Sequence, residues 1–70
     1  MFESINAYAE SLRKQLGTAL ASKAQAAKEL SVSRATLDRM RQEGQIRSQL
    51  VGKQVRFNVK EIARIVMAGQ

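Results

Sequence analysis

Residues 22–41 read SKAQAAKELSVSRATLDRMR, and this stretch predicts two short helices separated by a very short turn. Ser22 can cap the first helix while Gln25, three residues later, reaches back to the backbone of Ser22, which is the pattern of a capping box. We expect this helix to end near Leu30. A second capping serine, Ser33, follows almost at once, so the chain should enter the next helix with almost no linker.

The two predicted helices each have an apolar side and a polar side. Ala26 and Ala27 are small enough for the second helix to cross the first closely. The apolar seam between the helices should consist of Leu30, Val32, Leu37 and Met40. The exposed stripe of the second helix carries arginines, which can grip phosphate or read guanine through their paired donors. Two helices arranged in this way form a helix-turn-helix.

Length and composition exclude several classes of function. Seventy residues form one small domain. The chain has no cysteine and no histidine, which excludes disulfides, thiolate or imidazole metal sites, and catalysis by Cys/His or Ser–His–Asp groups. Neither a glycine-rich phosphate loop nor paired carboxylates at a useful spacing are present. We therefore predict a protein that is not an enzyme and that has no catalytic residue, metal or cofactor.

The sequence also gives an expectation for location. No apolar run approaches the roughly 20 residues of a membrane span. The first ten residues, MFESINAYAE, lack the basic start and the apolar middle of a signal peptide. We expect a cytoplasmic protein with no membrane partner.

Basic residues are in excess, and they are unevenly distributed. Twelve Lys and Arg against six Asp and Glu give a net charge of +6. Residues 1–21 contain two basic and two acidic side chains, so the whole excess lies in residues 22–70. A polyanion is the expected partner of that part of the chain.

An amphipathic helix is predicted from Ser4 to Leu16, and Gly17 should end it. Its stripe at helical spacing consists of Ile5, Tyr8, Ala9, Leu12 and Leu16. Two interpretations are open: the stripe packs on the core of the domain, or it pairs with a second copy of the chain. The candidate dimer interface is Ile5, Tyr8, Leu12 and Leu16. We expect residues 1–18 to form this helical segment and residues 20–70 the main domain, with residues 18–21 as a short strand or an extended connector.

The second half of the chain predicts a hairpin and a last helix. Gly44 can stop the second helix of the pair, and a two-residue turn at Gly52-Lys53 sets the hairpin register. The expected pairs are Val51 with Gln54, Leu50 with Val55, Gln49 with Arg56, and Ser48 with Phe57. One face should be half-buried and carry Ile46, Ser48, Leu50, Val55 and Phe57. The other face should be basic and carry Arg47, Gln49, Val51, Gln54 and Arg56.

A final helix should begin at Asn58, with Glu61 at the capping-box position. Its inward stripe should consist of Val59, Ile62, Ile65 and Val66.

Two segments of the chain resemble a known family. The run AAKELSVSRATLDRMRQEGQI, followed by VGKQVRFNVKEIARI, is similar to the excisionase-type branch of the MerR-like winged helix-turn-helix proteins. The shared features are an alanine pair, a Val-Ser turn, a Thr-Leu in the second helix, a Gly-x-Ile exit, a short basic wing and a capped closing helix. The resemblance covers about residues 20–67. It implies a mainly α fold with a small β-hairpin, namely a winged helix-turn-helix, here preceded by an N-terminal amphipathic helix.

The resemblance also implies where double-stranded DNA would be bound. The second helix would enter the major groove and the wing would follow the adjacent minor groove. The residues implied at the major groove are Ser33, Arg34, Ala35, Thr36, Asp38 and Arg39; those on the wing are Lys53, Gln54 and Arg56. Arg34 and Arg39 would reach base edges, Ser33 and Thr36 would hold phosphates, and Lys23 would make a further phosphate contact. Asp38 would either accept from a cytosine amino group or orient Arg34 or Arg41.

Three classes of function follow. The first is a recombination directionality factor of a phage or plasmid, which binds tandem DNA sites cooperatively and acts with an integrase; proteins of this type often repress promoters too. The second is a small dimeric transcriptional repressor that uses the N-terminal helix as its homodimer interface. The third is a protein-interaction module whose basic face meets an acidic protein.

Overall fold

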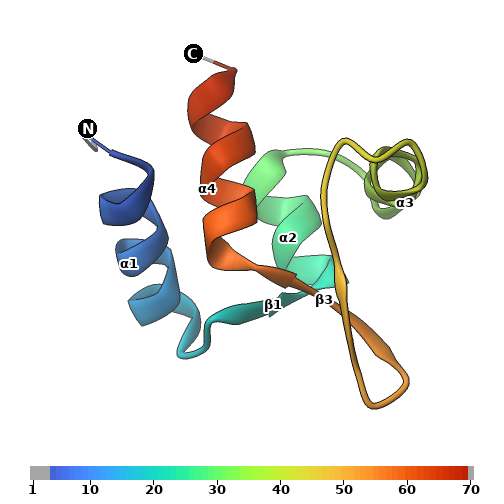
Figure 1. Ribbon diagram of the computed structural model, residues 1–70, viewed down its shortest axis with the longest axis horizontal. Coiled ribbons are helices and arrows are strands. Elements are labelled where there is room, and N and C mark those ends of the chain that lie inside the picture. The colour runs from blue at the N-terminus through green and yellow to red at the C-terminus, as the bar shows by residue number, and fades with distance from the viewer. Residues whose placement is uncertain (1–3, 70) are drawn as a thin grey trace.

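The computed structural model describes residues 4–69. These residues form four helices and a small antiparallel sheet (Figure 1). The elements are α1 (Ile5–Leu16), β1 (Leu20–Ser22), α2 (Lys23–Leu30), α3 (Arg34–Gln42), β2 (Gln49–Val51), β3 (Gln54–Asn58) and α4 (Val59–Ala68). The predicted fold class, a winged helix-turn-helix preceded by an amphipathic helix, is confirmed. Among the described residues, none of the helices combines the length and the hydropathy that a membrane-spanning helix needs.

The sheet settles the alternative that the sequence left open for residues 18–21. Its strand order is β1-β3-β2, so the segment before α2 is a true strand and lies against β3. The three predicted pairs nearest the hairpin turn are correct: Gln49 with Arg56, Leu50 with Val55, and Val51 with Gln54. The fourth pair is wrong, because β2 begins at Gln49 and does not include Ser48. Phe57 pairs with Ala21 of β1, on the other side of β3.

The turn between α2 and α3 is closed by backbone hydrogen bonds. The N–H of Val32 donates to the carbonyl of Ala27 at 3.0 Å, and the N–H of Ser31 donates to that of Lys28 at 3.1 Å. This pair of bonds is the Schellman pattern, which needs a left-handed residue after the helix. Ser31 occupies that position with φ = 59°, although it is not glycine. The predicted caps are present at the starts of both helices: Ser22 and Gln25 form a capping box at α2, and Ser33 accepts from the N–H of Thr36 at α3.

The core joins all parts of the fold. Its buried residues are Ala9, Leu12, Ala21, Ala26, Ala27, Leu37, Ile46, Phe57, Val59, Ile62 and Ala63. The predicted helix seam is part of it, since Leu37 is fully buried and Leu30, Val32 and Met40 pack against it. The small side chains of Ala26 and Ala27 allow this close crossing of helices.

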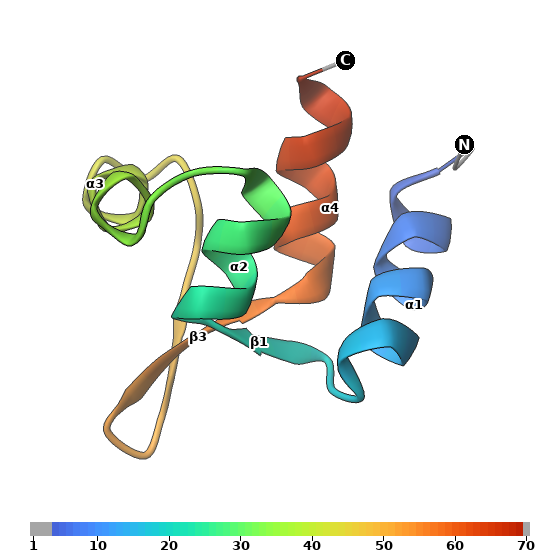
Figure 2. The same ribbon diagram turned by 180° about the vertical axis from the view of Figure 1, so that it is seen from behind.

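The N-terminal helix packs on the chain's own core. α1 lies along α4, and the two helices make the most extensive contact between elements of the fold (Figures 1 and 2). Leu12 is only 2 % exposed, and the hydroxyl of Tyr8 donates a hydrogen bond to Glu29 of α2. Tyr8 and Leu16 are half-buried against the core, while Ile5 is 40 % exposed. Of the four residues proposed for a dimer interface, Leu12 therefore offers no surface to a second copy in this conformation.

The hairpin of β2 and β3, which we call the wing, extends beyond the helices (Figure 2). The expectation of one half-buried face is correct at Ile46, Val55 and Phe57. It is wrong at Ser48, which is exposed, and at Leu50, which is 74 % exposed. Strand alternation assigns a face correctly, but it does not tell how far along the strand that face is covered.

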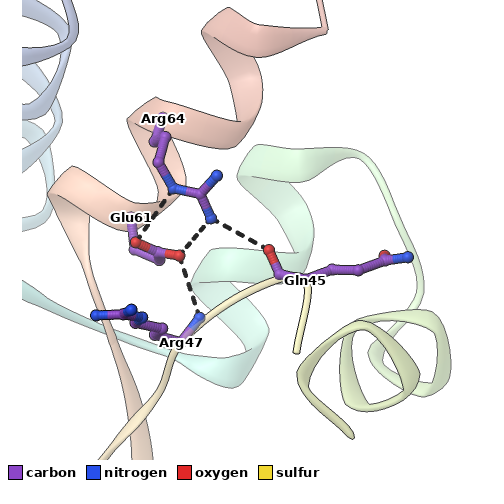
Figure 3. Close-up of polar contacts among 4 residues, drawn as sticks. All are labelled: Gln45, Arg47, Glu61 and Arg64. Carbon is purple, nitrogen blue, oxygen red and sulfur yellow. Dashed lines mark hydrogen bonds and ion pairs between the residues drawn. The ribbon is translucent and has the colours of Figure 1, made fainter. Parts of the chain in front are cut away.

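Glu61 does not form the predicted capping box. Asn58 caps α4 by accepting from the N–H of Lys60 at 2.8 Å. The carboxylate of Glu61 instead accepts from the backbone N–H of Arg47 at 3.2 Å and from the guanidinium of Arg64 at 2.5 Å (Figure 3). Arg64 also donates to the carbonyl of Gln45 at 3.2 Å. We call these four residues the loop clamp, because they tie the segment between α3 and the wing to α4.

Candidate nucleic-acid interface

A basic groove lies between the helix pair and the wing. It has a volume of about 520 Å³. Its lining consists of Ser22, Lys23, Ala24, Arg34, Lys53, Gln54, Val55 and Arg56. Four of these side chains are cationic, and among the described residues that line the groove none is acidic. A concave surface with one sign of charge concentrates the field on a ligand of the opposite sign.

The groove brings together three separate segments of the chain. Lys23 is the first residue of α2, Arg34 is the first residue of α3, and Lys53 to Arg56 lie on the wing. Their proximity depends on β1, which pairs with β3 and so places the start of α2 beside the wing. Five of the ten residues expected to bind DNA line this groove, namely Lys23, Arg34, Lys53, Gln54 and Arg56.

The other five candidates are Ser33, the N-cap of α3, and four residues of α3 itself. Ala35 and Arg39 are exposed, whereas Thr36 is half-buried. Ser33 caps the helix, and its hydroxyl donates to the hydroxyl of Thr36 at 3.0 Å. The first turn of α3 has no acidic residue, so its free N–H groups can attract an anion. Arg39, six residues after Ser33, is on the exposed side of the same helix.

Asp38 is engaged with cations of the protein itself. The ammonium of Lys23 lies 3.0 Å from one carboxylate oxygen and 3.3 Å from the other, and the guanidinium of Arg41 lies 3.6 Å away. The hydrogen bond from Lys23, together with the positive charges of Lys23 and Arg41, lowers the pKa of Asp38. Asp38 is therefore ionised at neutral pH. Of the two arginines considered as its partners, Arg41 is the one that it meets, while Arg34 lines the groove.

On the wing, Arg56 donates a hydrogen bond to the side-chain amide oxygen of Gln54. This contact holds two of the three wing candidates together on one strand. Lys53 is exposed at the hairpin turn. Gly52 supplies the positive φ of 65° that the first position of this turn requires.

Sequence reasoning missed three groove-lining residues, Ser22, Ala24 and Val55. Ser22 and Ala24 flank Lys23 at the start of α2, so the assignment of Lys23 as a phosphate contact was itself a signal for its neighbours. The alternation of the strand predicts Val55 on the inward face. The core does not extend to the tip of the wing, so Val55 is only half-buried and lines the groove.

α1 lies on the side of the molecule away from α3 (Figures 1 and 2). Among the described residues, no three acidic side chains gather in a way that could hold a metal ion.

Comparison with known proteins agrees with this geometry. Residues 22–69 match the family model described as a helix-turn-helix domain. The match begins at Ser22, the cap of α2, and continues through the wing and α4, so it leaves out α1. No curated protein and no solved structure matches the chain significantly.

Proposed function

Because this chain belongs to the helix-turn-helix domain family, it is a DNA-binding protein, and we propose that it acts as an excisionase-type recombination directionality factor of a phage or plasmid. Such a protein binds a specific double-stranded sequence and acts with an integrase. The observation that carries the proposal is the basic groove, in which Lys23, Arg34, Lys53 and Arg56 converge from the helix pair and the wing.

In this proposal α3 lies in the major groove of the duplex. Arg34 and Arg39 read base edges, because an exposed arginine on the outer face of such a helix can donate two hydrogen bonds to guanine. Ser33 and Thr36 hold a phosphate near the start of α3, where free N–H groups favour an anion. The small side chain of Ala35 lets the helix approach the bases closely.

The wing and Lys23 contribute contacts that fix position rather than sequence. Lys53, Gln54 and Arg56 follow the backbone and the minor groove next to α3. Lys23 meets a phosphate on the opposite side of the basic groove. In our proposal Asp38 reads no base and holds Lys23 and Arg41 in place, which is supported by the 3.0 Å and 3.6 Å contacts.

We further propose that the chain is a monomer in solution and assembles cooperatively on tandem sites. The burial of Leu12 at 2 % exposure supports this, because the apolar face of α1 is already used within the chain. A row of copies can bend the DNA and so bring the sites of an integrase together. The same occupancy can block a promoter, which would make repression a second effect of the same binding.

Footprinting on the DNA around the protein's own gene, combined with sedimentation of the free protein, tests this proposal. We expect protection of evenly spaced direct repeats by a protein that sediments as a monomer. Protection of an inverted repeat by a free dimer would instead identify a dimeric repressor. Failure to bind any duplex at low salt, with capture of an acidic protein, would identify a protein-interaction module.

A further inference from the structure

The tip of the wing carries two large apolar side chains in water. Leu50 is 74 % exposed and Val51 is 50 % exposed. At the other end of the same hairpin, Phe57 is fully buried. The core therefore ends partway along the wing, and its apolar pattern continues onto the exposed part.

The register of the wing tells which way these two side chains point. Side chains alternate along a strand, so Val55 lies on the same face as Phe57. Leu50 lies opposite Val55 and therefore shares this face, which is turned toward the helices. Val51 lies opposite Gln54 and belongs to the other face. Leu50 and Val51 are thus adjacent apolar residues whose side chains lie on opposite faces of the wing.

The surroundings of Leu50 favour DNA as the surface that covers it. Its partner Val55 lines the basic groove together with Lys53 and Arg56. A stable protein partner would need roughly 800 Å² of matching surface, whereas here the exposed apolar side chains are Leu50 and Val51, on opposite faces of a short hairpin beside the basic groove. The minor groove of DNA offers the complementary combination, since the apolar C–H edges of the sugars lie between two rows of phosphates. Leucine is among the apolar side chains that proteins place in this groove.

We propose that Leu50 packs into the minor groove beside the major groove that α3 occupies, and that it selects against a guanine amino group at this step. This inference rests on the DNA binding proposed above. In the minor groove a G·C pair differs from an A·T pair by the exposed amino group of guanine. A leucine that covers this group removes its water and offers no acceptor, and a buried donor without a partner is unfavourable.

The test uses a duplex that the wild-type protein enriches from a random-sequence pool. At the A·T pairs next to the α3 footprint, adenine is replaced by 2,6-diaminopurine, which adds an amino group in the minor groove and leaves the major-groove edge unchanged. We expect the wild type to lose at least about fivefold in affinity, as for an unfavourable base pair. Leu50→Ala should bind the unmodified duplex more weakly and should no longer respond to the added amino group.

Val51→Ala is the matched control, because it removes a neighbouring apolar side chain from the other face. It should keep both the affinity of the wild type and its response to diaminopurine. Both variants should keep the thermal stability of the wild type, since both side chains are exposed.

Each other outcome overturns the inference in a recognisable way. If the wild type binds its duplex but Leu50→Ala matches it on both duplexes, DNA binding stands and the role of Leu50 is wrong. Equal losses in Leu50→Ala and Val51→Ala would mean that the two faces of the wing do not differ. If the wild type enriches no duplex, the proposed function fails and the inference fails with it.

Discussion

The ammonium of Lys23 lies 3.0 Å from a carboxylate oxygen of Asp38, and this ion pair joins the first residue of α2 to the middle of α3. Both side chains are about one-third exposed, at 35 % and 34 %. Arg41 approaches the same oxygen at 3.6 Å. Asp38 lies on α3, the helix that we propose to bind in the major groove, and its carboxylate contacts two cations of its own chain.

Asp38→Asn tests whether this carboxylate positions cations or reads a base. We expect the variant to bind DNA of any sequence more tightly, because a negative charge close to the phosphates is removed, and to discriminate less between sequences, because Lys23 and Arg41 are held less firmly. The slope of log affinity against log salt should stay close to that of the wild type, since Lys23 meets a phosphate in both proteins. Binding to selected and scrambled duplexes at several salt concentrations measures both effects. A loss of affinity that depends on one particular C·G pair would show instead that Asp38 accepts from cytosine.

Arg39→Ala and Lys53→Ala should affect DNA binding in different ways. Arg39 is exposed on α3, and its loss should cost ~1–3 kcal/mol on the target and relax the sequence preference at one position. Lys53 is exposed at the wing turn, and its loss should weaken all sites alike and make the salt slope shallower by about 1. The wild-type slope should be roughly −4 to −5 if about five cations meet phosphates. Unchanged binding in both variants would mean that α3 and the wing are not the contact elements.

The loop clamp predicts a pH dependence of stability. The hydrogen bond from Arg64, followed by the N–H of Arg47 and the charges of both arginines, lowers the pKa of Glu61 despite its burial. The pKa of Glu61 is lower in the folded than in the unfolded chain. Its contribution is therefore complete above the unfolded pKa of about 4.3 and is lost as the pH falls through the folded value.

Glu61→Gln should accordingly lower the free energy of unfolding at pH 7 and reduce the loss of stability between pH 5 and pH 3. Arg64 is 49 % exposed, so water screens the pair and the effect at pH 7 should be only about 1 kcal/mol. Glu10→Gln is the matched control. Glu10 and Arg13 form the same kind of i,i+3 ion pair, but this pair does not hold a loop against the helix. Thermal melts at several pH values compare the two variants, and equal effects would contradict a specific role for the clamp.

Ser31→Gly should stabilise the protein. Ser31 has φ = 59°, and left-handed backbone costs a residue with a side chain roughly 1–2 kcal/mol, part of which the greater freedom of glycine in the unfolded chain offsets. We expect a gain of about 0.5–1 kcal/mol in the free energy of unfolding, with unchanged DNA affinity.

Gly17→Ala is the opposite substitution, because it replaces a glycine by a residue with a side chain at a left-handed position, φ = 75°. No atom lies within 4 Å of the added Cβ, so only backbone strain acts, and the variant should be destabilised by about 1 kcal/mol. Denaturant titrations measure both, and a destabilised Ser31→Gly would show that the serine side chain supports the turn.

Much of the fold can be predicted from the sequence because helix caps and tight turns depend on residues that are close together in the chain. A cap acts within three residues, so Ser22, Ser33 and Asn58 could be recognised as helix starts from sequence alone. Gly52 set the register of the wing for the same reason, because a two-residue turn fixes which residues lie opposite each other. The resemblance of residues 20–67 to a known family added the candidate DNA contacts, of which five line one groove.

The sequence by itself determined the helices, their inward faces, the hairpin register and the location of the positive charge, because these depend on neighbours within a turn or on composition. Only the tertiary structure decided that residues 20–22 form a strand against β3, that Leu50 lies beyond the core, and that α1 packs on α4. It also decided the distant partners of Glu61 and Asp38, namely the N–H of Arg47 and the ammonium of Lys23, which lie 14 and 15 positions away and add to the i,i+3 partners Arg64 and Arg41. A carboxylate binds whichever donor the packed fold brings within about 3 Å, and for these two distant donors that choice is made by the whole chain.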